Sequence, residues 1–550
     1  MNGDPAEPTP WFYRAMSFAS PFPDVDIPAA SVYDYLFGGI ADADMDRVAL
    51  IDAKSGAQTT YRELIARVDA FAGALADHGV GVGDVVGLLA PNSSAFAVAF
   101  HGILRAGATV TTVNVLFTAK DIVKQLTDSR ARMLVTVAAL LPQAREAAAA
   151  VGLTDADVVV LDGHGRQQGG HPSAADLLGA ALPAPQVAFD PATHLAALPY
   201  SSGTTGNPKG VMLTHRNLVA NVAQTRPIQD VQPEDVIIAI MPFFHIYGMT
   251  VLLNAALHAR ARLVMMPGFD LAEFLANIQS HKVTVAYIAP PVAVALAKHP
   301  LVDRHDLSSL RAVLSGAAPL DEELGHAVAD RIGCRVVQGY GMTELSPVSH
   351  ITPLDGGKSL VGSVAPMGAV GWTAANSESK LVDPATGDEI GIPAKGLSET
   401  GELWFKGPNV MAGYLGNEEA TRDTIDGDWL RTGDLARVDS SGCVYIVDRL
   451  KELIKYKGYQ VPPAELEAVL LTHPAIDDAA VVGVVDPESG EEVPKAFVVK
   501  RSGAELTEPD VIDFVAAEVA PYKKIRQVEF IDAIPKSTAG KILRKDLRTR

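Results

Sequence analysis

RLVMMPGFDLAEFLANIQSHKVTVAYIA, residues 262 to 289, decides the fold class of this chain. Its two ends, 262–267 and 283–289, are short apolar runs typical of buried strands, whereas 269–281 has apolar residues at helical spacing. A strand, a helix and a second strand in that order predict a parallel βαβ unit. The same alternation occurs at 85–115 and continues through 311–341. We therefore expect an α/β fold, with parallel sheets flanked by helices and ligands at the carboxyl ends of the strands.

Length and composition limit the classes of protein that this chain belongs to. With 550 residues, of which 48% are hydrophobic, it exceeds the size of one core, and we expect two or more domains. The formal net charge of −19 disfavours a nucleic-acid surface, so a small anionic ligand has to be held by local cations. Two cysteines, Cys334 and Cys443, are too few for a disulfide framework or a zinc ligand set.

The N-terminal segment carries acidic residues and prolines where a signal peptide needs basic and apolar runs. No uninterrupted apolar stretch reaches the length that spans a bilayer. The expectation is a cytoplasmic protein without a membrane span, and nothing in the sequence indicates an obligate protein partner.

The sequence pattern changes near residue 440. A helix starts at Pro463, two strand-like runs follow at 479–485 and 495–500, and Thr507 is placed to cap another helix. This pattern predicts a small α+β module of about a hundred residues. We place the joint at Asp448 to Lys451, so the expected division is a domain over 1–448, a hinge over 449–451 and a second domain over 452–550.

A glycine-rich segment, YSSGTTGNPKG at 200–210, is the main candidate for a phosphate site. We expect it to connect a strand to a helix that Thr214 caps. Its glycines allow backbone amides to turn toward an anion, its hydroxyls add donors and Lys209 adds charge. A Walker A loop is disfavoured, because Pro208 and Gly210 flank that lysine where glycine and Ser/Thr are needed. A polar surface turn is the other interpretation.

Five motifs together resemble those of the adenylate-forming superfamily. They are YSSGTTGNPKGVMLTH (200–215), GYGMTE (339–344), WLRTGD (429–434), VDRLKELIKYKGYQV (447–461) and IPKSTAGKILRK (534–545). The resemblance extends from about residue 25 to the end, and within the superfamily it is greatest to 4-coumarate:CoA ligases and their bacterial relatives. It implies a large N-terminal domain and a small mobile C-terminal lid.

The resemblance implies an ATP-dependent ligase that converts a carboxylic acid to an acyl-adenylate and then to a coenzyme A thioester. In this reading Thr343 contacts the α-phosphate, Glu344 binds Mg²⁺ and Asp434 accepts both ribose hydroxyls, while Ala317, Ala318, Gln338, Gly339 and Tyr340 surround adenine. The residues assigned to ATP or AMP are Ser201, Ser202, Gly203, Thr204, Thr205, Gly206, Lys209, Ala317, Ala318, Gln338, Gly339, Tyr340, Thr343, Asp434, Ile446, Arg449 and Lys541.

Two half-reactions imply two arrangements of the lid. The family pattern makes Lys541 the cation that bridges the substrate carboxylate and the α-phosphate during adenylation, although in isolation it reads as one lysine of a basic tail. Rotation about Lys451 would withdraw Lys541 and present another face of the lid to the adenylate and to coenzyme A. The residues of that face are Lys455, Lys457, Gly458 and Gln460.

The resemblance also implies an apolar slot for the acid. Its residues are Ile246, Tyr247, Val251, Gly339, Pro347 and Val348, and His245 is the aromatic gate beside the acyl carbonyl. A packing histidine and a core tyrosine are the alternative readings of His245 and Tyr340. Val251 replaces a serine of plant enzymes and Gly268 a lysine that contacts coenzyme A, which leaves the reaction class intact and the preferred acid open.

The motifs favour a ligase for 4-coumarate or related aryl-propenoic acids, but they are also compatible with other functions. A medium-chain fatty acyl-CoA ligase, a stand-alone enzyme that loads a carrier protein, and a luciferase-like oxygenase would all use the same adenylate. A catalytically inactive nucleotide sensor is disfavoured because Lys209, Thr343, Glu344, Asp434 and Lys541 occur together.

Overall fold

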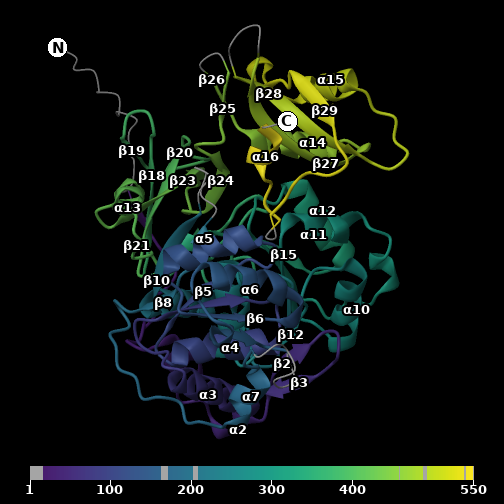
Figure 1. Ribbon diagram of the computed structural model, residues 1–550. Coiled ribbons are helices and arrows are strands. Elements are labelled where there is room, and N and C mark those ends of the chain that lie inside the picture. Colours follow the sequence, from purple (N-terminus) through teal and green to yellow (C-terminus); the bar gives the residue numbers. More distant parts are fainter. Residues whose placement is uncertain are drawn as a thin grey trace, which may run out of the picture.

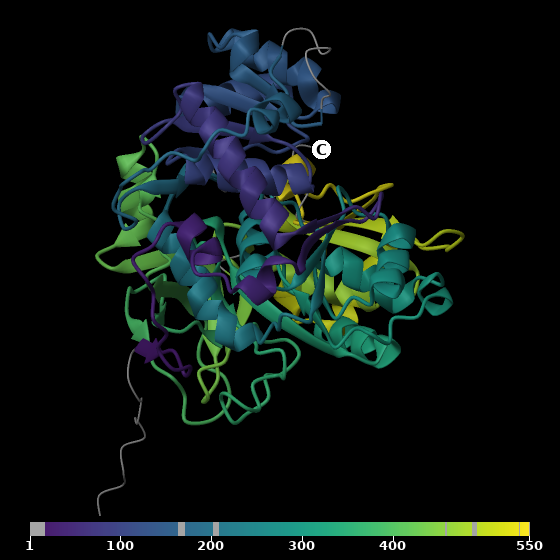
Figure 2. The ribbon, with the colours of Figure 1, turned by 90° about the horizontal axis from the view of Figure 1, so that it is seen from below.

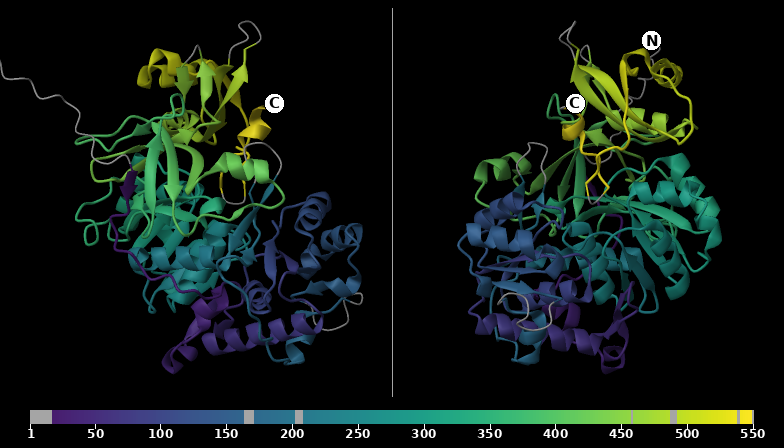
Figure 3. Two further views of the ribbon diagram at one scale, coloured as in Figure 1. Left: turned by 90° about the vertical axis from the view of Figure 1, so that its left-hand side faces the viewer. Right: turned by 45° about the vertical axis from the view of Figure 1, so that its right-hand side comes forward.

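A computed structural model describes residues 17–162, 171–201, 208–456, 459–486, 492–537 and 540–548. Figures 1 and 3 show a large body, coloured purple to green, with a smaller yellow part above it. We call the part from residue 452 onward the lid and the part before it the body. Parallel and mixed sheets flanked by helices make up the body, which confirms the predicted α/β class.

The first body sheet has the strand order β17, β16, β15, β14, β13, β11, β12, β2, β3, and it is parallel from β15 to β2. Its strands are β2 (Val48–Asp52), β3 (Gln58–Thr60), β11 (Val236–Ala239), β12 (Arg262–Met265), β13 (Val285–Ile288), β14 (Ala312–Ser315), β15 (Arg335–Gly341), β16 (Val348–Ile351) and β17 (Trp372–Thr373). Helices α11 (Pro290–Lys298) and α12 (Glu322–Ile332) connect neighbouring strands, whereas α10 (Leu271–His281) connects β12 to the parallel strand β13 with β11 between them. The strand, helix and strand that the 262–289 pattern predicts are all present.

The second body sheet has the strand order β21, β10, β8, β5, β4, β6, β7, with β9 paired to β10. Its strands are β4 (Val85–Leu89), β5 (Thr109–Thr112), β6 (Met133–Thr136), β7 (Val158–Val160), β8 (Leu195–Ala197), β9 (Tyr200–Ser201), β10 (Lys209–Thr214) and β21 (Gly413–Tyr414). Helices α3 (Tyr61–Asp77) and α4 (Ser94–Arg105) pack on each other, and α4 contacts strands of both sheets. In Figure 2 the purple α3 lies between the blue and teal parts of the body.

The other body helices lie in the order of the chain. They are α1 (Val32–Phe37), α2 (Asp42–Met45), α5 (Ala119–Ser129), α6 (Leu141–Ala150), α7 (Ala174–Gly179), α8 (His215–Gln229), a π-helix (Tyr247–Asn254), α9 (Ala255–His258) and α13 (Glu418–Thr424). Thr214 caps α8, because its hydroxyl accepts the backbone N–H of Asn217 at 3.2 Å.

A third, antiparallel sheet joins the body to the lid. It consists of β1 (Ser17–Ala19), β18 (Glu378–Val382), β19 (Glu389–Ile390), β20 (Gly401–Lys406), β22 (Ile425–Asp426), β23 (Trp429–Val438) and β24 (Val444–Arg449). Strand β24 pairs antiparallel with β23 and ends at Arg449, from which the chain enters the lid. The joint that the sequence predicts at 448–451 therefore overlaps the end of a sheet strand, because Asp448 and Arg449 are the last two residues of β24.

The lid has a hydrophobic core of its own. Strands β27 (Ile476–Val485) and β28 (Glu492–Lys500) are antiparallel, and β29 (Gln527–Phe530) is parallel to β28. Around them lie β25 (Ile454–Tyr456), β26 (Tyr459–Val461), α14 (Pro463–Thr472), α15 (Glu508–Glu518) and α16 (Arg544–Arg548). The predicted helix start at Pro463 and the Thr507 cap are both present, and the α+β character of this module is confirmed.

Candidate active site

The carboxyl ends of the parallel strands lead directly into the predicted site residues. The chain leaves β11 toward 240–247, β13 toward the start of α11, β14 toward 316–318 and β15 toward 342–345. In a parallel sheet these ends share one edge, so segments far apart in the sequence meet there. Four groups of predicted site residues, which we call corners, are found in this region.

The glycine-rich segment lies between two antiparallel strands. Lys209 on β10 is directly opposite Ser201 on β9, whereas 202–206, with the predicted residues Ser202, Gly203, Thr204, Thr205 and Gly206, lie outside the described residues. The expected strand-to-helix connection is wrong, because KGVMLT forms the strand β10 before α8 begins. Residues 211–213 are consecutive apolar side chains, and the strand that contains them separates the glycine-rich segment from the start of α8.

The first corner contains Glu344. A short 3₁₀ turn, Thr343–Leu345, follows β15 and carries both Thr343 and Glu344. The Glu344 carboxylate is 6% exposed and accepts the hydroxyl of Tyr414 on Oε1 at 2.8 Å. Lys209 Nζ lies over the Tyr414 ring, 4.6 Å from its centroid. The structure thus joins two predicted ATP-site residues through a tyrosine that the sequence reasoning missed.

The second corner joins Tyr340, Asp434 and Arg449 from three strands. The Tyr340 hydroxyl donates to Asp434 Oδ2 at 2.6 Å, and Arg449 Nε lies 3.2 Å from Asp434 Oδ1. Burial, followed by the charge of Asp434, raises the pKa of Tyr340 well above its ordinary value, so the phenol stays protonated. Ile446 and Tyr340 pack against one small cluster of apolar residues. Both oxygens of Asp434 therefore have partners in this structure.

The third corner is built around Gln338, whose side chain bonds to backbone groups. Its Oε1 accepts the N–H of Leu320 at 2.9 Å, and its Nε2 donates to the carbonyl of Met367 at 2.6 Å. The side chain of Gln338 thus stabilises the segment after β14 through these hydrogen bonds. In that turn Ala317 has a φ of 71°, in the left-handed region that alanine seldom adopts, and Ala318 follows it.

The predicted acid slot begins at the π-helix. Ile246, Tyr247 and Val251 are buried, and a methyl group added at Gly316 would meet the Tyr247 hydroxyl at 3.1 Å. Across the sheet edge, a methyl group at Gly339 would lie 3.4 Å from the carbonyl oxygen of His350. Pro347 and Val348 are buried. At Gly316 and Gly339 the sheet edge therefore carries no side chain, and a methyl group at either position would contact a neighbouring group.

The fourth corner brings the end of the lid to the body. A methyl group at Gly540 would lie 3.1 Å from Cβ of Ala289, so the lid turn rests on the start of α11. Burial, followed by the charge of Arg449, lowers the pKa of the adjacent Lys541 to about 8. Burial, followed by the Lys541 charge, lowers the pKa of His245 to about 4, so this imidazole is neutral at pH 7. The charge of Lys541 therefore reaches His245.

The hinge residue Lys451 is exposed beside a groove of about 500 Å³ between body and lid. The groove is lined by Pro384, Ala385, Leu450, Lys451, Leu453 and Lys455. Lys455 pairs with Gln460 across the β25–β26 ribbon, whereas Lys457 and Gly458 lie outside the described residues. In this arrangement Lys541 is the lid lysine whose pKa responds to the charges of Arg449, which lowers it, and Asp434, which raises it.

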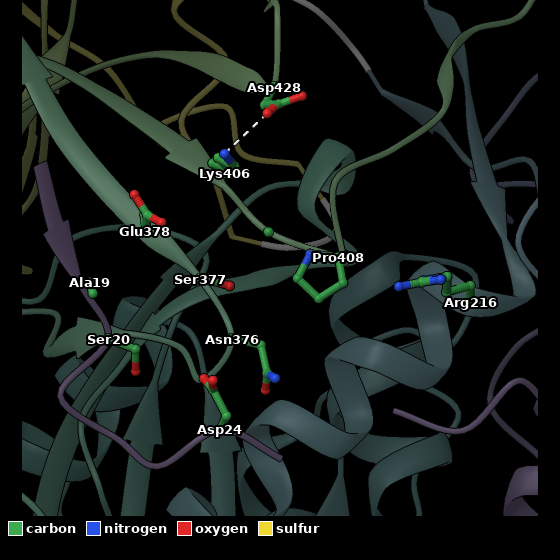
Figure 4. Close-up of a pocket in the computed structure, with 11 residues that line it drawn as sticks. Ala19, Ser20, Asp24, Arg216, Asn376, Ser377, Glu378, Lys406, Pro408 and Asp428 are labelled. Atoms are coloured by element: carbon green, nitrogen blue, oxygen red, sulfur yellow. Dashed lines mark ion pairs between the residues drawn. The ribbon is translucent and has the colours of Figure 1, made fainter. Parts of the chain in front are cut away.

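A larger polar cavity, of about 660 Å³, lies elsewhere (Figure 4). It is lined by Ala19, Ser20, Asp24, Arg216, Asn376, Ser377, Glu378, Lys406, Gly407, Pro408 and Asp428. The ion pair between Lys406 Nζ and Asp428, at 3.0 Å, crosses one side of it. None of these lining residues is a predicted site residue, so the cavity is separate from the region at the sheet edge.

Among the described residues, no cluster of three His, Cys, Asp or Glu side chains could hold a metal ion. Glu344 offers a carboxylate oxygen, because its Oε2 accepts no hydrogen bond from the described part of the chain. A single carboxylate fits Mg²⁺, which takes one or two protein carboxylates and completes its shell with water and phosphate oxygens. No helix in the described ranges is long and apolar enough to cross a membrane.

Comparison with known proteins identifies the class that this fold and site define. The family model for AMP-binding enzymes matches residues 40–415, and the model for their C-terminal domain matches 465–541. The chain belongs to the AMP-binding enzyme family, which confirms the predicted superfamily.

Particular relatives resemble the chain over almost all of its length. It is 43% identical to 4-coumarate-CoA ligase 5 of Oryza sativa subsp. japonica, covering 97% of both chains. It is 41% identical to 4-coumarate-CoA ligase 1 of Petroselinum crispum, covering 97% of this chain and 96% of that one.

Two crystal structures of MatB from Rhodopseudomonas palustris also resemble the chain. The ATP-bound form is 30% identical, covers 95% of this chain and 99% of its own, and superposes with a TM-score of 0.84. The apo form, with the same identity and coverage, has a TM-score of 0.74. The structure described here is therefore more similar overall to the ATP-bound relative than to its apo form.

Proposed function

We propose that this protein is an ATP-dependent carboxylic acid:CoA ligase whose preferred acid is 4-coumarate or a related aryl-propenoic acid. The observation that carries the proposal is the position of Lys541, a lid cation that follows a turn resting on Ala289 of the body and whose charge interacts with those of the body residues Asp434, Arg449 and His245. The names of the plant relatives, with identities of 43% and 41%, support the reaction and the class of acid. The division into a domain over 1–448, a hinge over 449–451 and a lid over 452–550 is part of the same proposal.

The first half-reaction joins the acid to AMP and releases pyrophosphate. Its nucleophile is a carboxylate that is ionised at neutral pH, so the site needs no general base. The obstacle is repulsion between that carboxylate and the phosphates, and the ammonium of Lys541 would offset it at the α-phosphate. Burial helps here, because the same charge interacts more strongly where water is excluded.

Other residues would bind and orient ATP. The 201–206 loop with Lys209 would hold the β- and γ-phosphates, and Thr343 the α-phosphate. Asp434 would accept the ribose hydroxyls, exchanging its Tyr340 and Arg449 partners for them, and the Tyr340 ring would lie beside adenine. Glu344 would bind Mg²⁺, which, when bound, supplies positive charge to the phosphates.

The second half-reaction transfers the acyl group from AMP to the thiol of coenzyme A. We propose that the lid turns about Lys451, which removes Lys541 and brings the β25–β26 ribbon to the site. Lys455, Lys457, Gly458 and Gln460 would then contact the adenylate and the pantetheine arm. The higher TM-score to the ATP-bound MatB than to its apo form supports assigning the present arrangement to adenylation.

The decisive experiment measures pyrophosphate release with hydroxycinnamates, benzoates and medium-chain fatty acids, each with and without coenzyme A. We expect 4-coumarate-like acids to give the highest kcat/KM, and mass spectrometry to detect the thioester only when coenzyme A is present. A higher kcat/KM with octanoate would replace the proposed acid by a medium-chain fatty acid. If no carboxylic acid releases pyrophosphate, the proposed reaction is wrong.

A further inference from the structure

Tyr414 connects the two charged side chains that the proposed function assigns to the triphosphate. Its hydroxyl donates to Glu344 Oε1 at 2.8 Å, and its ring lies beneath Lys209, with Nζ 4.6 Å from the centroid. Tyr414 is 7% exposed. One buried aromatic side chain thus contacts an anion through its edge and a cation through its face.

The backbone fixes Tyr414 in this position. Strand β21 pairs with β10, so Tyr414 is opposite Val211, two residues after Lys209. The N–H of Leu415 donates to the Gly210 carbonyl at 2.8 Å, and the N–H of Tyr414 donates to the Thr421 hydroxyl at 2.9 Å. Glu344 is tied to the same segment, because its carbonyl accepts the N–H of Met411 at 2.9 Å. The three side chains therefore sit on one hydrogen-bonded frame.

Each contact leaves the charged partner free for a ligand. A hydroxyl on Oε1 orients the Glu344 carboxylate and leaves Oε2 for a divalent cation, which is the usual role of a group behind a metal ligand. An aromatic face attracts an ammonium without neutralising it. Among the described residues Lys209 forms no ion pair, and its ammonium lies over the Tyr414 ring instead, so a carboxylate does not compete with phosphate for it.

We propose that Tyr414 is a positioning residue of the ATP site, which orients Glu344 toward Mg²⁺ through its hydroxyl and Lys209 toward phosphate through its ring. This inference rests on the proposed function. It predicts that the two roles separate by mutation: Tyr414→Phe removes the hydroxyl alone, whereas Tyr414→Leu also removes the aromatic face.

The chain provides a matched control in Tyr33. Its hydroxyl donates to Asp69 Oδ1, also at 2.8 Å, Arg105 lies 4.8 Å above its ring, and it is 8% exposed. Tyr33→Phe therefore removes the same kind of hydrogen bond from the same kind of environment. Tyr33 lies on α1, which contributes no predicted site residue.

The experiment is isothermal titration calorimetry of the full chain with α,β-methylene-ATP over a series of Mg²⁺ concentrations and in EDTA. For Tyr414→Phe we expect the Mg²⁺ concentration for half-maximal binding to rise about 10-fold, the lower end of the range for groups behind metal ligands, with unchanged affinity in EDTA. Tyr414→Leu should also lose affinity in EDTA, because Lys209 is no longer held. Tyr33→Phe should match the wild type in both conditions.

A double-mutant cycle provides the second measurement. If the hydroxyl acts through Glu344, Tyr414→Phe should add no further shift to a Glu344→Gln background. Additive shifts in the cycle, or the same Mg²⁺ dependence for Tyr414→Phe and Tyr33→Phe, would overturn the inference while the proposed ligase reaction stands. If the wild type binds the analogue without any Mg²⁺ dependence and forms no thioester, the proposed function fails and the inference fails with it.

Discussion

Asp448 and Ala464 connect the two sides of the hinge: Oδ2 of the Asp448 carboxylate accepts the backbone N–H of Ala464 at 3.0 Å. Asp448 lies on β24 of the body, and Ala464 lies in the first turn of the lid helix α14. The carboxylate thus satisfies one of the free N–H groups at the positive end of that helix. Lys451, the proposed hinge, lies between these two residues in the sequence, so rotation about it would change their distance. The contact is present in the arrangement in which the charge of Lys541 interacts with that of Asp434.

We predict that Asp448→Ala impairs adenylation and spares thioester formation. A hydrogen bond to a charged group is worth about 1.5–3 kcal/mol, so losing it should lower the adenylation rate by about 10-fold or more as the lid shifts to other arrangements. Pyrophosphate release reports the first half-reaction, and a supplied acyl-adenylate with coenzyme A reports the second. Asp270→Ala, which removes a carboxylate cap from α10 in the body, is the matched control. Equal losses in the two half-reactions of Asp448→Ala would contradict a role in lid position.

Lys541→Ala should abolish adenylation by orders of magnitude, because the repulsion between carboxylate and α-phosphate is no longer offset. The same variant should convert a supplied acyl-adenylate to the thioester at close to the wild-type rate. Rapid-quench assays of each half-reaction test this. A comparable loss in both half-reactions would mean that Lys541 supports the structure of the site and not the first chemical step.

The pH dependence of adenylation should follow the ionisation of Lys541. The pKa of this lysine is lowered to about 8 by burial and by Arg449, so the required ammonium is present below that pH and lost above it. We therefore expect kcat/KM, which reports the free enzyme, to fall as the pH rises through about 8. In Lys541→Arg the guanidinium stays charged, so its kcat/KM, although lower, should be flat over this range. A falling limb that persists in Lys541→Arg would assign it to another group.

Arg544 is predicted to stabilise the lid. Its guanidinium contacts Glu452 and bonds to Glu467 at 2.6 Å, and the three side chains are between 10% and 13% exposed. Arg544→Ala leaves two buried carboxylates without their cation, and such a loss costs about 3–5 kcal/mol. The exposed Arg422→Ala, which loses only an ion pair to Glu418, should cost less than about 0.5 kcal/mol.

Hydrogen exchange of α14 and β27 measures the stability of the lid directly, since all four tryptophans of the chain precede residue 430. Exchange in these elements should accelerate in Arg544→Ala while exchange in β13 of the body stays unchanged. Unaltered protection of α14 would show that water or another cation replaces the guanidinium.

Much of the fold was predictable, because its signals are local. The apolar runs around 262–289 and the caps at Thr214 and Thr507 depend on residues within a few positions of one another. The sequence predicts that the glycine-rich segment leads into a helix, whereas in the structure the strand β10 comes first. KGVMLT reads equally well as the approach to a helix, and only pairing with β9 and β21 makes it a strand.

Tyr414 shows what sequence reasoning missed. The segment around it, NVMAGYLGN, has the composition of a turn, and no local pattern marks its tyrosine as a partner of a carboxylate 70 positions away. Pairing of β21 with β10 creates that contact. One sequence signal could have identified Tyr414. It is an aromatic residue in a short strand, β21, that pairs with β10, the strand that carries Lys209.

The sequence by itself determined the α/β class, the family and the residue types available for phosphate, ribose and carboxylate, because each is written in contiguous motifs. Only the tertiary structure decided that the charge of Lys541, from the last motif, interacts with His245 and Asp434, and that Asp448 bonds to Ala464 across the hinge. The physical reason is that these contacts depend on how two separately folded cores are oriented, and that orientation is set by burial and charge between segments that are distant in the chain.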